Sequence, residues 1–441
     1  MNKTLMPFQV TGERFLMNSY HALLAWEMGL GKTCTTISAI EKLGLKNILV
    51  ICPASVRSGW KLEIEECLGK DEGRRWDIIS YNAATDPKHR ANLADSYDVI
   101  VCDESHFLRT PEAARTLAIF GDAGGLARRA KYKWMLSGTP VLNRPRELYV
   151  VLRCLAAGKI APYGDFSDFA QRFCSAYFDG RSINTKGASN LDDLSQRIMG
   201  GSSPFMHRRT KAETFPELPT RIVKRIPVEV SAADWKAVED VEREIVDREA
   251  FISTTHENFS QLGDIAMLRR TTGLAKVRAV AAFVDDLLET IDKIVVFTWH
   301  RDVLTNLIAD LSGRGRGCVA FQGGMSDTAK TAAVYKFVND ANCQVFVGNM
   351  QAAGTGLNGL QVANDVVLAE PDWTPGTMDQ AIARVDRMGK QSPGPVTAYI
   401  PYIPGSLESS MLGVGDRKTK IIERLLGGSW NAQPSLLEGL V

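Results

Sequence analysis

Residues 27–33 have the clearest chemistry in this chain of 441 residues. They read Glu-Met-Gly-Leu-Gly-Lys-Thr, and the Gly-Lys-Thr ending is typical of a loop whose backbone N–H groups surround phosphate oxygens. Lys32 would reach the β- and γ-phosphates, and the Thr33 hydroxyl would ligate Mg²⁺. A helix predicted over 34–40 adds its positive end to the site. Trp26 stands where the usual pattern begins with glycine, and Gly-Lys-Thr alone also fits a turn before a helix.

An acidic pair follows an apolar run at 97–102, in the order Asp103-Glu104-Ser105-His106. In a phosphate-loop ATPase, Asp103 would hold Mg²⁺ through water and Glu104 would polarise the attacking water. Acidic residues at the end of a strand are otherwise often helix caps. Because Gly-Lys-Thr precedes them, we favour the ATPase interpretation.

Two polar groups elsewhere could serve the same nucleotide. Gln9 precedes the loop, and its amide can read adenine as donor and acceptor together, although a lone glutamine is usually a surface residue. Gln380, Arg384 and Arg387 fall at i, i+4 and i+7, on one face of a predicted helix. Two arginines on one face are usually a solvated stripe, but here they could complete an ATP site as arginine fingers.

The elements that must position these residues form two α/β patterns, each with apolar strand-like runs separated by helical stretches. Active groups then lie at the carboxyl ends of the strands, as open α/β sheets require. The first pattern has predicted strands at 47–53, 77–81, 97–102 and 133–136. The second has predicted strands at 293–298, 317–321, 343–347, 365–369 and 395–400.

A mainly helical region, about 152–290, separates the two patterns. Within it the basic cluster at 205–211 is interpreted as a solvated helix end, and Pro216, Pro219 and Pro227 as an extended connector between lobes. We therefore expect an N-terminal lobe at 1–218 with a helical insertion at about 152–210. A C-terminal lobe at 219–441 would have a helical protrusion at about 230–290 and a core at about 291–441.

The composition is that of an ordinary globular protein, with 45% hydrophobic and 23% charged residues. The net charge of +1 gives no strong overall field, so nucleic acid would have to be bound by local patches. None of the eight cysteines forms a C-x-x-C pair, which argues against a zinc ribbon. The start resembles no signal peptide, and no apolar run approaches the ~18 residues of a membrane span. We expect an intracellular, cytoplasmic protein.

Seven motifs in the right order resemble a superfamily-two helicase motor, and more narrowly the SWI/SNF family of DNA-dependent ATPases. Within that family the annealing-helicase, fork-remodelling branch is the most similar, through 103–109, 136–149, 206–211 and 273–278. The seven motifs are Pro7-Phe8-Gln9, 27–33, 52–55, 103–106, 136–140, 353–358 and 380–389.

The resemblance implies two tandem RecA-like lobes, each a parallel sheet flanked by helices. It implies ATP-binding residues Gln9, Met28, Gly29, Leu30, Gly31, Lys32, Thr33 and Cys34, with Thr33 and Asp103 on Mg²⁺. It implies catalytic residues Lys32, Asp103, Glu104, Gln380, Arg384 and Arg387. It also implies that Ser55, His106, Thr139 and Thr355 contact nucleic acid or couple it to the ATP site. Trp26, Asp386 and Lys390 depart from the family's usual residues.

We therefore predict a monomeric, ATP-driven motor on duplex or forked DNA that contacts phosphates and is largely independent of sequence. The first alternative is a strand-separating DNA or RNA helicase of the same superfamily, with RNA the less favoured track. The second is a non-catalytic, ATP-gated binding module. That module would need a defective catalytic residue, and Lys32, Asp103, Glu104, Arg384 and Arg387 are all present.

Overall fold

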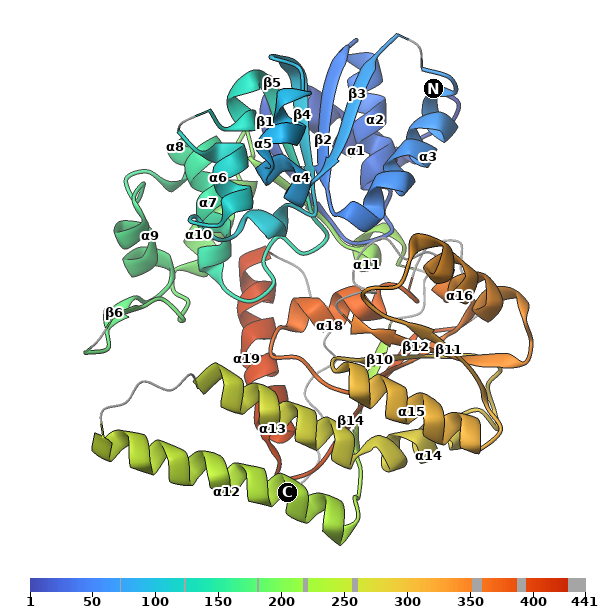
Figure 1. Ribbon diagram of the computed structural model, residues 1–441. Coiled ribbons are helices and arrows are strands. Elements are labelled where there is room, and N and C mark those ends of the chain that lie inside the picture. The colour runs from blue at the N-terminus through green and yellow to red at the C-terminus, as the bar shows by residue number, and fades with distance from the viewer. Residues whose placement is uncertain are drawn as a thin grey trace. The chain divides into compact units, whose positions relative to one another are not determined.

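A computed structural model describes residues 1–426 except 72, 123, 181, 217–220, 256–260, 351–358 and 387–393. The chain divides into two compact units, of which one contains Met1–Leu218 and Lys418–Trp430 and the other contains Pro219–Arg417 and Asn431–Val441. Each unit is built around a six-stranded parallel sheet flanked by helices (Figure 1). The predicted α/β class with two parallel sheets is confirmed.

The sheet of the first unit has the order β3-β2-β4-β5-β1-β8, and every neighbouring pair is parallel. Its central strands are mostly apolar and are buried toward their carboxyl ends, because helices cover both faces. The strands are β1 (His21–Trp26), β2 (Asn47–Cys52), β3 (Arg75–Ser80), β4 (Tyr97–Asp103), β5 (Ala130–Leu136) and β8 (Met206–Arg209).

The helices of the first unit connect these strands or extend the lobe after β5. A two-stranded antiparallel ribbon, β6 (Tyr177–Phe178) and β7 (Ile183–Asn184), lies between α9 and α10. The helices are α1 (Pro7–Met17), α2 (Lys32–Lys42), α3 (Arg57–Leu68), α4 (Tyr81–Thr85), α5 (Pro87–Ala91), α6 (Ala114–Phe120), α7 (Tyr149–Leu155), α8 (Ala157–Ile160), α9 (Phe166–Phe173), α10 (Leu191–Met199) and α11 (Lys211–Thr214). Short 3₁₀ turns are η1 (Ala54–Val56), η2 (Ser105–Leu108), η3 (Leu126–Arg129) and η4 (Pro145–Leu148).

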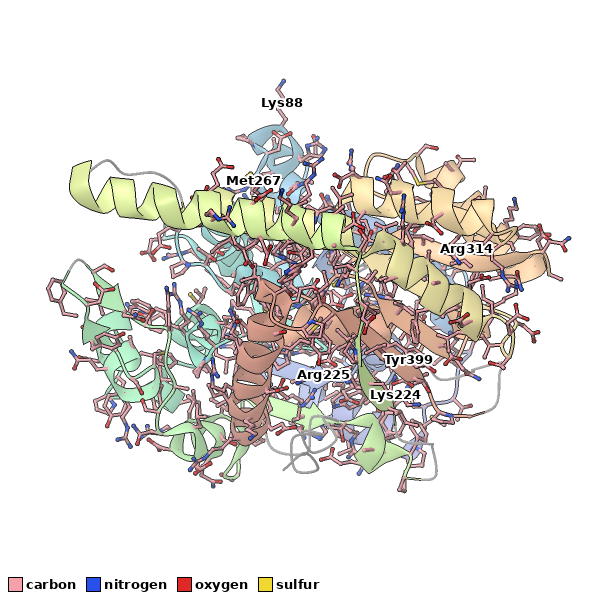
Figure 2. The ribbon with its side chains drawn as sticks, turned by 90° about the horizontal axis from the view of Figure 1, so that it is seen from below. Lys88, Lys224, Arg225, Met267, Arg314 and Tyr399 are labelled. Atoms are coloured by element: carbon pink, nitrogen blue, oxygen red, sulfur yellow. The ribbon has the colours of Figure 1, made fainter. Side chains whose placement is uncertain are left out.

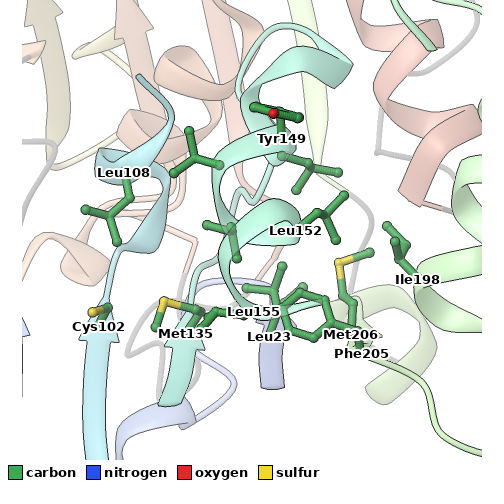
Figure 3. Close-up of a cluster of buried hydrophobic side chains, with 14 of the residues drawn as sticks. Leu23, Cys102, Leu108, Met135, Tyr149, Leu152, Leu155, Ile198, Phe205 and Met206 are labelled. Atoms are coloured by element: carbon green, nitrogen blue, oxygen red, sulfur yellow. The ribbon is translucent and has the colours of Figure 1, made fainter. Parts of the chain in front are cut away.

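Successive side chains of a strand point to opposite faces of the sheet, so this sheet packs against two separate hydrophobic cores. On one face Leu24 and Val101 pack with α1, α2 and α3. On the other, Leu23, Cys102 and Met135 pack with helical residues such as Tyr149, Leu152 and Ile198 (Figure 3). The sheet is thereby held rigidly from both sides, which fixes the carboxyl ends of its strands.

The second unit has the order β11-β12-β10-β13-β14-β9, also parallel throughout. Its strands are β9 (Ile222–Pro227), β10 (Ile294–Thr298), β11 (Gly317–Phe321), β12 (Cys343–Asn349), β13 (Asp365–Leu368) and β14 (Thr397–Tyr402). Its helices are α12 (Ala232–Thr255), α13 (Gln261–Ala275), α14 (Val277–Leu287), α15 (Arg301–Gly313), α16 (Asp327–Asn339), the 3₁₀ turn η5 (Leu360–Val362), α18 (Pro375–Ile382) and α19 (Leu407–Leu426). Residues 418–426 of α19 group with the first unit.

Three strands were not recognised in the sequence, and one interpretation, that of the basic cluster, was wrong. The apolar run His21–Trp26 before the loop was not recognised as a strand, yet it is β1, which lies between β5 and the edge strand β8. The basic cluster is not a solvated helix end, since Met206–Arg209 form the edge strand β8. Part of the proline-marked connector is β9, whose Lys224 is paired with Tyr399 of β14 and lies over its ring (Figure 2). None of the described helices is long and apolar enough to cross a bilayer.

Candidate functional site

The loop between β1 and α2 has the backbone that a phosphate-binding turn needs. Gly29 and Gly31 have φ values of 87° and 76°, in the left-handed region that favours glycine. Gly31 also caps α2, and a Cβ there would lie 2.2 Å from Gln9 Nε2. Glycine is thus required at position 31 both for its conformation and for space. The first N–H groups of a helix have no acceptor within the helix, so the start of α2 is suited to bind an anion.

Lys32, the first residue of α2, folds back over this loop. Its Nζ donates to the carbonyl oxygens of Trp26, at 2.9 Å, and Glu27, at 3.3 Å. Both of these acceptors are neutral carbonyl oxygens. A phosphate is a stronger partner than a carbonyl for this charge, so the position suits an anion-binding lysine.

Gln9 lies against the loop, as the sequence predicted. Its side chain is there used in hydrogen bonds within the protein. It is buried in α1, where its Oε1 accepts from the Met6 N–H at 2.9 Å. Its Nε2 donates to the Leu30 carbonyl at 3.3 Å. Gln9 therefore ties the start of α1 to the loop, and its reading of adenine stays a prediction.

Cys34 and Thr33 follow Lys32 in the first turn of α2. Thr33 is partly exposed, whereas Cys34 is buried with its Sγ 3.3 Å from Cys67 Sγ on α3. Burial raises the pKa of both thiols, that of Cys67 to about 12. Together with Glu63 they are the group of three potential metal ligands found among the described residues. Protonated thiols bind metals poorly, so these contacts hold α2 against α3.

Asp103 is the last residue of β4 and is 7% exposed. Its Oδ2 accepts from Trp60 Nε1 at 2.8 Å, and its Oδ1 accepts from the Glu104 N–H at 2.9 Å. Its carbonyl accepts from the Tyr81 hydroxyl at 2.8 Å. Burial and the charge of Glu104 raise the pKa of Asp103 to about 6, against the opposing effects of Trp60 and Lys32. A cation at this carboxylate would relieve both causes of the shift.

Glu104 adopts a left-handed backbone, with φ 51° and ψ 50°, which is uncommon for a residue with a side chain. Its Oε2 is buried and has no hydrogen-bond partner, while His106 Nδ1 lies 3.4 Å from it. A buried carboxylate oxygen without a donor is costly. Glu104 thus combines a strained backbone with an unsatisfied acceptor, directly beside Asp103.

His106 connects this acidic pair to the end of β5. Its Nδ1 lies 3.3 Å from Ser137 Oγ, and Ser137 Oγ accepts from the backbone N–H of Thr139 at 3.2 Å. Burial, followed by the charges of Arg109, Lys32 and Arg115, lowers the pKa of His106 to about 3. A neutral imidazole therefore links Glu104 to the Ser137–Thr139 turn, where Thr139 is itself buried.

The same turn packs directly on the phosphate-binding loop. A Cβ at Gly138 would lie 2.8 Å from Met28 Cγ. The loop, the turn after β5 and the acidic pair after β4 are thus one packed assembly at the carboxyl ends of three neighbouring strands. Ser55, by contrast, is exposed in η1, after β2.

Arg208 is a site residue that the sequence interpretation missed. Its side chain in β8 is 6% exposed, and its Nη1 donates to the carbonyls of Ala25, at 2.7 Å, and Gly138, at 3.3 Å. Its Nη2 lies 3.9 Å from Glu27 Oε1. The cation therefore joins β1, the loop and the turn after β5. An apolar strand directly before the loop was the available signal that the sheet continued, but nothing local marks Met-His-Arg-Arg as its edge.

The second unit contains the other predicted residues. Gln380 lies in α18, which ends at Ile382, so Arg384 lies in the following turn and the helical stripe was wrong at this position. Arg384 is 3% exposed, which rules out a solvated position for its side chain. Thr355 and Arg387 lie outside the described residues, as do the whole motif at 353–358 and the residues 387–389.

A different carboxylate is prominent in the second unit. Glu370 follows β13, and its Oε2 accepts from the backbone N–H groups of Trp299, at 2.7 Å, and His300, at 3.0 Å. Its Oε1 lies 2.6 Å from His300 Nδ1. A Cβ at Gly273 would lie 2.6 Å from this Oε1. Glu370 therefore holds the turn between β10 and α15 in place through these contacts.

Comparisons with known proteins cover nearly the whole chain. The family model "SNF2-related domain" matches residues 8–99 and 73–277, and the model "Helicase conserved C-terminal domain" matches residues 275–389. The DNA annealing helicase and endonuclease ZRANB3 of Homo sapiens is 28% identical over 459 residues, which cover 96% of this chain and 40% of that protein.

A second relative is the SWI/SNF-related matrix-associated actin-dependent regulator of chromatin subfamily A-like protein 1 of Xenopus tropicalis. It is 31% identical over 414 residues, which cover 89% of this chain and 42% of the relative. The chain thus spans about two fifths of the length of these relatives. The solved Sulfolobus solfataricus SWI2/SNF2 ATPase core in complex with dsDNA aligns over 98% of this chain and 95% of its own, with 22% identity and a TM-score of 0.43.

Proposed function

The chain belongs to the SNF2-related domain family, and from this premise we propose that it is an ATP-dependent DNA translocase. It would hydrolyse ATP when bound to duplex or forked DNA and would remodel or anneal that DNA. The proposal treats 1–218 and 219–441 as its two lobes. It would act as a monomer on DNA in the cytoplasm.

The observation that carries the enzymatic part is the pair at the end of β4. Asp103 is buried with a raised pKa, and the neighbouring Glu104 has a buried oxygen without a donor. A carboxylate oxygen without a donor, beside a second buried acid, costs stability unless a ligand uses it. The anion site at Gly31 and Lys32 supplies the complementary half, so these residues fit a nucleotide with a bound Mg²⁺.

Within this proposal each residue has a distinct role. Mg²⁺, when bound, would neutralise charge on the phosphates. Thr33 and Asp103 would hold it, and Lys32 would bind the phosphates. Glu104 would orient the attacking water and accept its proton, because its free oxygen is the nearest base in the site. Arg384 and Arg387 would act as arginine fingers, with Gln380 beside them.

The DNA part rests on the family and on the link through His106. Ser55, Thr139 and Thr355 would contact the phosphate backbone, which makes binding salt-dependent and independent of sequence. The chain His106–Ser137–Thr139 would transmit the nucleotide state to those contacts. The human relative carries the words annealing helicase in its name, which favours DNA as the track.

The experiment is steady-state ATP hydrolysis by the purified chain with no nucleic acid, single-stranded DNA, duplex DNA, forked DNA or RNA, at one stated salt concentration. We expect the strongest stimulation with duplex or forked DNA. Stimulation by RNA or single strands alone would move the assignment to the strand-separating alternative. Bound ATP that never turns over would favour the binding module.

A further inference from the structure

The thiol groups of Cys34 and Cys67 contact each other between α2 and α3, and the proposed reaction uses neither of them. Their sulfur atoms lie 3.3 Å apart. Cys34 is 7% exposed and Cys67 is fully buried. Both are free thiols, so the two helices are joined here by a non-covalent contact.

Each of these helices supports a different part of the proposed ATP site. Cys34 directly follows Lys32 and Thr33 in the first turn of α2. Helix α3 contains Trp60, whose Nε1 donates to Asp103 Oδ2 at 2.8 Å. The two helices pack against each other, side by side in Figure 1. The thiols thus lie where the helix that carries the phosphate-binding residues meets the helix that supports the acidic pair.

The distance between the sulfur atoms allows a disulfide after a small movement. A disulfide bond is about 2.0 Å long, so the sulfurs of Cys34 and Cys67 must approach each other by about 1.3 Å. Such a movement is small for two packed helices. At catalytic groups, however, a displacement of about 1 Å can reduce a rate about 10²-fold. A bond at this position would therefore be felt in the ATP site.

The two thiols differ in how their surroundings are held. The Cys67 carbonyl accepts from the Asn2 N–H at 2.6 Å, and Lys3 Nζ donates to Glu63 Oε1 of α3 at 3.0 Å. Cys34 instead lies in the first turn of α2, directly after a loop with two left-handed glycines. We therefore expect the first turn of α2, which carries the phosphate-binding lysine, to move toward α3 when the bond forms.

Burial decides how readily the two thiols react. It is the largest effect on both, and it raises the pKa of Cys34 and of Cys67 against the opposing charge of Lys3. Because the thiolate is the reactive form, the pair should stay reduced unless an oxidant is present in excess. Cys34 is the thiol with exposed surface, so a small oxidant should reach it first.

The same thiols could instead bind a metal together with Glu63, since ligand atoms of the three residues lie within 4.8 Å of one another. Glu63, however, is paired with Lys3 at 3.0 Å, and that ammonium competes with a metal cation. A metal would also have to displace the protons of both buried thiols. The direct contact between the sulfur atoms therefore favours a disulfide over a metal site.

We propose that Cys34 and Cys67 form a reversible disulfide in the presence of a hydroperoxide, and that this bond slows ATP hydrolysis. Cys34 sulfur attacks the peroxide and breaks its O–O bond, which gives a sulfenic acid and releases water or an alcohol that takes the thiol proton. Cys67 sulfur then attacks Cys34 sulfur, and the sulfenic OH group leaves with the Cys67 proton as water. Two thiols thus lose two electrons, and a dithiol reductant reverses the reaction by exchange. The effect on hydrolysis rests on the proposed function, whereas formation of the bond does not.

The test compares the full chain with variants at two positions. Cys67→Ser removes one partner and keeps the size of the buried side chain, and Cys67→Ala does so without placing a hydroxyl group in an apolar core. Cys154→Ser is the matched control, because it removes an exposed thiol from the same unit. Each protein is treated with reductant, with hydrogen peroxide, or with diamide, which joins thiols without adding oxygen.

Three quantities are measured on each sample. Peptide mapping by mass spectrometry, after free thiols are blocked, identifies which cysteines are joined. Steady-state ATP hydrolysis is measured with the DNA that stimulates it most, and the affinity for a fluorescent ATP analogue is measured without DNA. The oxidised samples are then treated with dithiothreitol and measured again.

In the unaltered chain and in Cys154→Ser, we expect both oxidants to join Cys34 to Cys67 and to lower hydrolysis at least about tenfold. Dithiothreitol should restore the rate. Both Cys67 variants should keep the rate of their reduced form after treatment with diamide, because Cys34 then has no partner. The affinity for the ATP analogue should fall in the same samples in which hydrolysis falls.

The inference is wrong if Cys154 is oxidised in the unaltered chain while Cys34 and Cys67 stay unlinked, or if the linked chain hydrolyses ATP at the full rate. One Zn²⁺ per chain that is lost in Cys67→Ser would also overturn it, since the thiols would then be metal ligands. Failure of the proposed function is separate. The reduced chain would then hydrolyse no ATP with any DNA, and peptide mapping and the affinity for the analogue would still test the inference.

Discussion

The two sheets place a glutamate in similar positions and treat it in opposite ways. Glu104 directly follows β4 of the first sheet, and Glu370 follows β13 of the second by two residues. Three N–H groups converge on the carboxylate of Glu370. The Oε2 of Glu104 is buried with no donor, beside a second acid. The two glutamates therefore follow a strand in a similar way and differ in the number of donors to their carboxylates.

This comparison makes separable predictions. A satisfied carboxylate contributes to folding, so its removal should appear in stability. An unsatisfied carboxylate costs stability and is retained for the ligand, so its removal should appear in activity. Substitutions at the two positions should therefore affect different measurements.

Glu104→Gln should have the largest effect. We expect a loss of about 10³-fold in the single-turnover rate of ATP hydrolysis, because the amide cannot accept the proton of the attacking water. The urea midpoint of unfolding should not fall, since one of two repelling acids is removed. Glu112→Gln, at an exposed position of the same unit, is the control. Full hydrolysis by the Glu104 variant would sink the catalytic assignment.

Glu370→Ala should instead reduce stability, by about 2–4 kcal/mol, because it leaves His300 Nδ1 and two backbone N–H groups without their acceptor. Urea denaturation followed by circular dichroism measures this effect. Basal hydrolysis per folded molecule should change little. If stability is retained while basal hydrolysis collapses, the contrast between the two glutamates is wrong.

The sequence predicted the features that depend on residues close together in the chain. The strands of both sheets other than β1, β8 and β9 could be predicted from apolar runs, and burial on both faces explains such runs in the central strands. The family could be predicted from the ordered motifs, and the family models confirm it. The loop glycines followed from the backbone conformations that phosphate binding requires.

The sequence was uninformative where a residue's role depends on distant partners. Arg208 is buried only because β8 pairs with β1, more than 180 residues earlier, and because Ala25 and Gly138 offer their carbonyls. α18 ends before Arg384 because the backbone hydrogen bonds change there to the i→i−3 pattern of a tighter turn. No proline or glycine in the sequence marks this change. Periodicity gives a face of a helix but does not show whether the helix continues.

Trp60→Phe tests the hydrogen bond that Trp60 donates to Asp103. Its effect should be smaller than the effects of the two glutamate substitutions. The indole N–H donates to Asp103 Oδ2, and phenylalanine keeps most of the packing without that donor. We expect about a tenfold rise in the Mg²⁺ concentration needed for half-maximal hydrolysis, since hydrogen bonds to charged groups are strong. Trp76→Phe is a matched control, because Trp76 Nε1 donates to Asp71 Oδ2 at the same 2.8 Å. An equal change in both variants would show that Trp60 has no particular role at Asp103.

The smallest predicted effect concerns His106, and its sign can be worked out. Its pKa is near 6.5 in the unfolded chain and is lowered to about 3 in the fold. The unfolded state therefore binds the proton first, and stability is lost as pH falls below about 6.5. Asp103 acts in the opposite direction, because its pKa is raised to about 6 and the folded state takes up its proton first. Comparison with His106→Asn removes the Asp103 contribution, which both proteins share.

Between pH 7 and about pH 5.5, the unaltered chain should lose about 1 kcal/mol of unfolding free energy relative to His106→Asn. Urea titrations at several pH values, without nucleotide, measure this difference. Asparagine can still donate to Ser137 Oγ, so the contact to the turn after β5 can be kept while the titrating group is removed. If the two proteins showed the same pH dependence, the imidazole would be titrating normally, and the link between Glu104 and Thr139 could not rest on a buried neutral histidine.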